Sequence, residues 1–185
     1  HQKMSTGILF RDHLNSIGIL PGIKVDTGAK DFSCHPNEKI TEGLDGLRDR
    51  LINYEKLGAK FCKWRAVITI GDNIPSQACI LSNCNALARY ASLCQENNLV
   101  PIVEPEVLIN GKHSIDRCNT VTRETLKCLF DQLESLNIYL PGTILKPSMV
   151  ISGDSNGSRA DFTMVADMTI KCLKDICPDD LGGIA

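Results

Sequence analysis

Four short apolar runs, rich in β-branched residues, alternate with longer segments of helical periodicity along this chain. The runs are GIKV near residue 24, FCKWRAVITI near 66, LVPIVEPEVL near 103 and GTILKPSMVI near 146. The apolar positions of the intervening segments fall on four helical faces: Leu44, Leu47, Leu51 and Tyr54; Leu81, Cys84, Ala88 and Ala91; Leu126, Leu129, Phe130, Leu133 and Leu136; Phe162, Val165, Thr169, Leu173 and Ile176. Strands that alternate with helices of this length predict an α/β fold with a parallel sheet.

The ends of two helices carry boundary signals. Gly58 follows the first helical segment, where a left-handed C-terminal cap is expected. Ser158-x-x-Asp161 resembles a capping box that would open the last one.

Two α/β architectures fit this order of elements, an open doubly wound sheet and a closed (β/α)₈ barrel. No GxGxxG or GxxxxGK[ST] turn follows any of the runs, which removes the usual signature of nucleotide-binding sheets. Four strand–helix units are half of a barrel, whose full form commonly needs about 250 residues. His1 stands in place of an initiator Met, and LGGIA resembles the start of another strand, so we expect a piece of a longer protein.

Composition narrows the class of partner. The 185 residues are 43% apolar and 23% charged, as in one globular domain, and the net charge of −2 leaves no basic excess for nucleic acid. No apolar run approaches the roughly 18 residues of a membrane span, and the first ten residues lack the apolar centre of a signal peptide. Nine cysteines without a CxxC pair are expected to be reduced. We therefore expect a cytoplasmic protein with no nucleic-acid or membrane partner.

Each apolar run also carries ionisable residues, and most of them are two positions apart. These residues are Lys24 and Asp26, Lys63 and Arg65, Glu104 and Glu106, and Lys146. Residues two apart in a strand point to one face, and unpaired charge in a covered parallel sheet is costly. We therefore expect one polar cluster at the C-terminal rim of the strands, where α/β folds bind ligands.

Two of these residues precede a proline, Glu104 before Pro105 and Lys146 before Pro147. A following proline favours extended backbone, and proline is poorly tolerated inside a central ladder. Both residues are therefore expected at strand ends rather than in the middle of the sheet.

Such a cluster suits Schiff-base chemistry. A partly desolvated lysine among other cations has a lowered pKa, and the neutral amine adds to a carbonyl; Lys146 or Lys63 could serve. Glu104 could then move the protons of carbinolamine dehydration. The excess of positive charge favours an anionic, phosphorylated substrate.

The strings GIKVDTG, GLDGL, KWR, NALARYASLCQ, LVPIVEPE and ILKPSMV closely resemble those of class I fructose-bisphosphate aldolase, the metal-free Schiff-base enzyme of glycolysis. The match follows the family's order over nearly the whole chain. It implies a (β/α)₈ TIM barrel without cofactor, of which residues 1–185 form one partial domain with strands three to six.

The resemblance also implies roles for the charged residues. Lys146 corresponds to the Schiff-base lysine, Glu104 to the acid and base of imine formation, and Lys63 to the lysine that supports the reacting carbons. Lys24 and Arg65 resemble substrate-binding residues, and Asp26 and Glu106 resemble charge partners that hold the lysines in place. One departure is Ser148, where the family usually has Asn.

The implied activity is reversible cleavage of fructose 1,6-bisphosphate to dihydroxyacetone phosphate and glyceraldehyde 3-phosphate. The GILAADES-like and SGGQS-like segments of the family do not occur here, so these residues alone are expected to show little cleavage. The alternative is a non-catalytic aldolase-like chain with a structural or interaction role. The resemblance further implies a homotetramer and partners such as actin or other cytoskeletal proteins.

Two other classes share one feature each with this sequence. Asp26-Thr27-Gly28 matches the triplet of aspartic proteases, but that class needs an all-β frame. A zinc-dependent aldolase needs converging histidines, whereas His1, His13, His35 and His113 fall outside the charged strand ends. Neither class is favoured.

Overall fold

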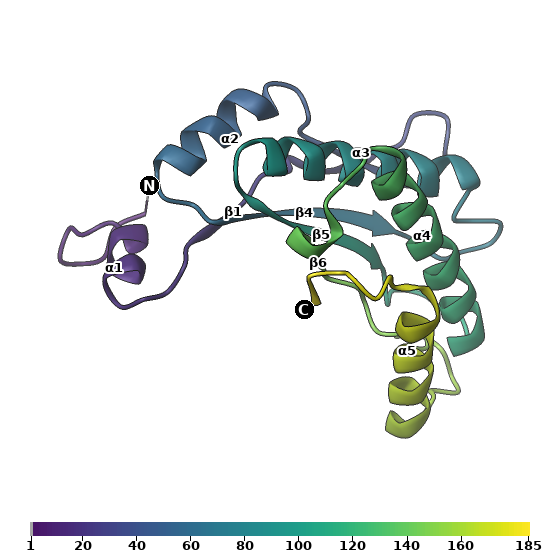
Figure 1. Cartoon of the computed structure of the whole chain (residues 1–185). Coiled ribbons are helices and arrows are strands. Elements are labelled where there is room, and N and C mark those ends of the chain that lie inside the picture. The colour runs from purple at the N-terminus through teal and green to yellow at the C-terminus, as the bar shows by residue number, and fades with distance from the viewer. Residues whose placement is uncertain (1) are drawn as a thin grey trace.

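A computed structural model describes residues 2–185 and contains a five-stranded parallel sheet (Figure 1). Its strands, in spatial order, are β1 (Gly22–Lys24), β4 (Phe61–Ile68), β5 (Val100–Val107), β6 (Ile144–Leu145) and β7 (Gly183–Ile184). The predicted α/β class and the four predicted strands are confirmed. The fifth strand lies in the LGGIA segment.

Five α-helices accompany the sheet. They are α1 (Phe10–Ser16), α2 (Leu47–Lys56), α3 (Gln77–Glu96), α4 (Ile115–Ser135) and α5 (Phe162–Ile176), with a short 3₁₀ turn, η1 (Leu140–Gly142), before β6. Most residues of the four predicted helical faces lie on α2 to α5, but Leu44 and Leu136 lie outside the helices, and Leu81 and Phe162 are exposed. Within residues 2–185, no helix is both long and apolar enough to cross a membrane.

Two features were not predicted, α1 and an antiparallel hairpin of β2 (Gly28–Asp31) and β3 (Lys39–Glu42). The hairpin lies between β1 and α2 in the chain, and most of its side chains are at least partly exposed. Its ladder therefore leaves little trace in the pattern of apolar residues.

The helix boundaries agree with one of the two signals. Gly58 adopts a φ of 91° directly after the C-cap of α2, as predicted. The capping box at Ser158 is wrong, because α5 begins one residue after Asp161. The Asp161 carboxylate accepts a hydrogen bond from the N–H of Met164 at 2.8 Å and is itself the N-cap.

The core lies between the sheet and the helices that run along one of its sides (Figure 1). On β4, Cys62, Trp64 and Ala66 are fully buried, while Lys63 and Arg65 between them are only partly covered. Trp64 stacks on Tyr90 of α3 with ring centroids 5.5 Å apart. The side-chain period of two thus separates an apolar face from a charged one.

Proline does not end β5 as expected. Glu104 and Pro105 both lie inside this strand, so the placement of Glu104 at a strand end is wrong. The Val103 carbonyl accepts the Lys146 N–H at 2.9 Å, and residues two apart in a strand bond to the same neighbour. Pro105 therefore faces the β6 side, but β6 pairs only with Ile102 and Val103 and ends before it. Pro105 has no N–H to donate, but no strand lies beside it to accept one, so the sheet loses no hydrogen bond.

Candidate functional site

The seven predicted ionisable residues gather on the charged face, five within β1, β4 and β5, and Asp26 and Lys146 just after the ends of β1 and β6. In the register of the sheet, Lys24 lies opposite Lys63, and Arg65 lies opposite Glu104. The expected position at the C-terminal rim is wrong for Lys63, which lies in the first half of β4. The strand continues past Lys63 as far as Ile68, because the apolar residues at its end pair with the end of β5. Lys63 therefore lies well before the C-terminal end of its strand.

Glu104 is the centre of the first group of contacts. Its Oε2 accepts a hydrogen bond from the Lys63 Nζ at 2.6 Å, and its Oε1 accepts one from the Lys146 Nζ. Glu104 is 4% exposed, whereas the Lys146 side chain is 48% exposed. One buried carboxylate therefore bridges two lysines from different strands, and the more accessible amine belongs to Lys146.

The ionisation of Glu104 follows from these contacts. Burial by itself raises the pKa of the Glu104 carboxyl, but the hydrogen bonds and charges of Lys146 and Lys63 outweigh burial and bring the pKa below its ordinary value. Glu104 is thus an anion at neutral pH and accepts a hydrogen bond from each lysine.

Asp26 organises the second group. Its side chain is buried, and it forms an ion pair with Lys24. One carboxylate oxygen accepts the main-chain N–H of Gly28 and the other that of Arg65, each at 3.1 Å. Asp26 therefore connects β1 to β4 through the backbone as well as through charge.

The third contact joins Arg65 to Glu106 by an ion pair between its Nε and the carboxylate. Glu106 thus faces the arginine rather than a lysine. Four cations and three anions meet across these contacts, which leaves one excess positive charge on this face. Such an excess attracts an anionic ligand.

The backbone around Lys146 is anchored on both sides. Its own N–H bonds to Val103, as described above. Four positions further on, the Val150 N–H donates to the Thr169 Oγ1 at 3.0 Å, and the next N–H, of Ile151, donates to the Cys118 Sγ at 3.4 Å. Sequence reasoning missed Thr169 and Cys118, because a polar atom that binds distant backbone leaves no motif.

A hollow of about 340 Å³ opens beside the two lysine-bound oxygens of Glu104. Lys146, Glu106, Ser148 and Met149 also line it. The Ser148 hydroxyl oxygen is buried and has no hydrogen-bond partner among residues 2–185. The hollow thus has a lysine amine, a glutamate carboxylate and a serine hydroxyl among its lining residues.

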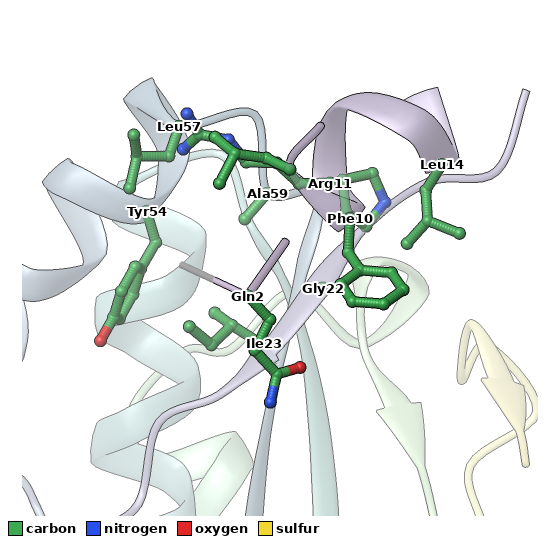
Figure 2. A pocket seen from close by; sticks show the side chains of 11 residues that line it. Gln2, Phe10, Arg11, Leu14, Gly22, Ile23, Tyr54, Leu57 and Ala59 are labelled. Carbon is green, nitrogen blue, oxygen red and sulfur yellow. The ribbon is translucent and has the colours of Figure 1, made fainter. Parts of the chain in front are cut away.

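A second hollow, of about 480 Å³, lies at the opposite end of β1 (Figure 2). Phe10, Leu14, Ile23 and Tyr54 surround it together with Arg11, and none of the seven ionisable residues lines it. Its apolar lining offers neither a nucleophile nor an acid–base pair, so the candidate site is the charged face.

The histidines do not build a metal site. Among residues 2–185, no group of three His, Cys, Asp or Glu side chains could hold a metal ion. His35 stacks on Phe32 with ring centroids 4.2 Å apart. Burial lowers the pKa of His113, whose ring nitrogens have no hydrogen-bond partner within the described part of the chain. His1 lies outside the described residues.

Comparison with known proteins identifies relatives with a matching sequence and fold. The family described as fructose-bisphosphate aldolase class-I matches residues 1–185. A probable fructose-bisphosphate aldolase class 1 from Xanthomonas axonopodis pv. citri is 54% identical over 183 residues, which are 99% of this chain and 55% of that protein. Cytosolic fructose-bisphosphate aldolase 4 of Arabidopsis thaliana is 46% identical over 96% of this chain and 45% of its own length.

A solved structure agrees with these relatives. Fructose-bisphosphate aldolase from Plasmodium falciparum, solved with TRAP and a small molecule inhibitor, superimposes with a TM-score of 0.97 at 41% identity. The match covers 100% of this chain and 54% of that one, so the chain spans about half the length of its relatives and matches their TIM barrel over that part. The chain belongs to the class I fructose-bisphosphate aldolase family.

Proposed function

We propose that this chain contributes the Schiff-base half of a fructose-bisphosphate aldolase, which reversibly cleaves fructose 1,6-bisphosphate to dihydroxyacetone phosphate and glyceraldehyde 3-phosphate. The observation that carries the proposal is the Lys63–Glu104–Lys146 bridge, in which each carboxylate oxygen accepts one ammonium group. A partly exposed amine next to a buried base is the arrangement that imine formation requires.

The proposed steps use these three residues. Glu104 accepts one proton from the Lys146 ammonium, and the neutral Nζ attacks the substrate ketone carbon, so that a carbon–nitrogen bond forms as the carbonyl double bond opens. A second proton moves from the nitrogen to the oxygen, which becomes a hydroxyl. Glu104 donates the proton that lets this hydroxyl leave as water. Lys63 holds the other Glu104 oxygen and keeps the carboxylate aimed at the reacting nitrogen.

The remaining four residues are proposed to bind the substrate. Lys24 and Arg65 supply positive charge for a phosphate, as the excess of one cation on this face supports. Asp26 and Glu106 hold these two cations in place through their ion pairs. The names of the cytosolic plant relatives support a cytoplasmic location.

Borohydride trapping tests the proposal without requiring complete turnover. The chain is incubated with dihydroxyacetone phosphate, reduced, and digested with trypsin, which leaves Lys146 inside the peptide 128–159 because Pro147 blocks cleavage. We expect the adduct on Lys146 and its loss in a Lys146→Arg variant. Lys60→Arg, one residue before β4 and outside the seven ionisable residues, is the matched control and should keep the label. Labelling confined to other lysines would overturn the assignment.

The second candidate is a non-catalytic interaction role, alone or in a homotetramer. It is favoured by exposed apolar side chains on α5, among them Phe162 at 95% exposure, and by the unpaired outer edges of β1 and β7. Light scattering after size exclusion, run beside the trapping assay and an actin co-sedimentation assay, separates the two. Self-association without trapping supports the interaction role, and trapping supports the enzyme.

A further inference from the structure

Two cysteines of the helical layer face each other across the α3–α4 interface. The Cys84 Sγ on α3 donates a hydrogen bond to the carbonyl of Thr125 on α4 at 3.5 Å. The same two helices are joined nearby by a hydrogen bond of 2.9 Å from the Asn85 amide to the Gln132 side chain. Figure 1 shows α3 and α4 packed side by side.

The position of Cys84 brings it within reach of Cys128. A helical side chain leans toward the N-terminal end of its own helix and covers the turn that begins three or four residues earlier. Cys128 therefore leans over the turn that begins at Thr125, where the Cys84 sulfur lies. Each thiol also shifts the pKa of the other, that of Cys84 upward and that of Cys128 downward.

The two thiols differ in access. Cys84 is 1% exposed, whereas Cys128 is only half-buried. An oxidant therefore reaches Cys128 first, and the buried Cys84 is the neighbouring thiol that can react with it. Cys62 and Cys94, a second adjacent pair, are both 0% exposed.

We propose that Cys84 and Cys128 are an oxidation site, which hydrogen peroxide converts into a disulfide that links α3 to α4. The Cys128 thiolate attacks one peroxide oxygen, so that a sulfur–oxygen bond forms, the oxygen–oxygen bond breaks and hydroxide leaves as water. The Cys84 sulfur then attacks the Cys128 sulfur, the sulfur–oxygen bond breaks and a second water leaves with the Cys84 proton. Two thiols lose two electrons in total, and peroxide is reduced to two waters.

The crosslink would enclose part of the candidate site. Residues 84 and 128 flank β5, so the covalent ring contains Glu104 and Glu106. Oxidation would therefore restrain the strand that carries the acid–base group, although neither sulfur contacts the charged face. This inference does not depend on the proposed aldolase activity.

Peptide mapping after oxidation tests the proposal. Dilute protein is treated with hydrogen peroxide, its free thiols are alkylated, and it is digested with trypsin without reduction. We expect a linked pair of peptides, 66–89 and 128–159, that is two hydrogens lighter than their sum and disappears on reduction. Cys128 is the single cysteine of the second peptide, while the first contains Cys79 and Cys84.

Variants resolve that ambiguity and keep the proposal falsifiable. The linked pair should be lost in both Cys84→Ala and Cys128→Ala and should persist in the matched control Cys79→Ala. A link that persists in Cys84→Ala would overturn the assignment. So would the absence of any link under conditions that oxidise the exposed Cys34. Alkylation-resistant Cys62 and Cys94 in the same digests, together with unchanged circular dichroism, show that each variant was folded when it was treated.

Discussion

The two faces of the sheet differ although the same strands build both. On β4, Trp64 is fully buried beneath α3, while Lys63 and Arg65 on either side of it reach into ion pairs on the other face. The apolar face stabilises the fold by burial, which is non-directional. The charged face depends on the placement of individual atoms, because a buried charge without its partner is costly. Substitutions on the two faces should therefore differ in size and in their response to pH.

Truncation of Trp64 should have the largest effect. Trp64→Ala removes the largest side chain of the apolar face and its stacking on Tyr90, so we expect a loss of about 3–5 kcal/mol in the free energy of unfolding. Urea denaturation measures this loss. Phe61→Ala, an aromatic truncation on the other face of the same strand, is the matched control and should cost less. Equal losses would show that the faces are not distinct in stability.

Removal of the central anion should come next. Glu104→Gln leaves Lys63 and Lys146 without a carboxylate between them, and we expect a loss of about 2 kcal/mol, reduced by the partial exposure of both lysines. Thermal and urea unfolding at neutral pH measure it. A gain in stability would mean that the desolvation of Glu104 exceeds the benefit of its two ion pairs.

Acid should act through the same carboxylate. Because the folded-state pKa of Glu104 lies below its ordinary value of 4.5, its contribution is present above that value and is lost as the pH falls through the folded pKa. On acidification the wild type should therefore lose more free energy of unfolding than Glu104→Gln does. The difference between the two losses should be smaller than the loss that Glu104→Gln causes at neutral pH. Unfolding curves of both proteins from pH 7 to pH 3 test the difference. Parallel curves would contradict it.

The smallest effect is expected at the outer ion pair of the charged face. The Glu106 side chain is 31% exposed, so Glu106→Gln should change stability by less than about 1 kcal/mol. Its comparison with Glu104→Gln under the same conditions isolates the effect of burial for two carboxylates two residues apart on one strand. A loss as large as that of Glu104→Gln would show that burial does not separate them.

The sequence predicts this division of faces better than it predicts the contacts. The period of two on β4 and β5 places Lys63, Arg65, Glu104 and Glu106 on one face from spacing alone. It cannot show that Lys63 meets Glu104, because that diagonal pairing depends on the register between strands.

Other errors have the same origin. Pro105 lies inside β5 because the neighbouring strand β6 is short, a fact that no local pattern in β5 contains. The N-cap of α5 is Asp161 rather than Ser158, since either residue type is compatible with a helix start and the packing of α5 selects one. The local pattern of residues thus predicted which segments form strands and helices. The pairing and packing of distant segments determined the strand ends, the N-cap of α5 and the side-chain contacts.

The bridge at Glu104 makes two amines on separate strands thermodynamically linked. Whatever changes the charge or position of Lys146 also changes how strongly the shared carboxylate holds Lys63, and the coupling is reciprocal. In the proposed imine the Lys146 nitrogen keeps at most one proton, so that the Lys63 ammonium becomes the donor with more N–H groups for that carboxylate. A change in the charge of the Lys146 nitrogen therefore alters the strength of the ion pair of Lys63, although the two lysines come from different strands of the sheet.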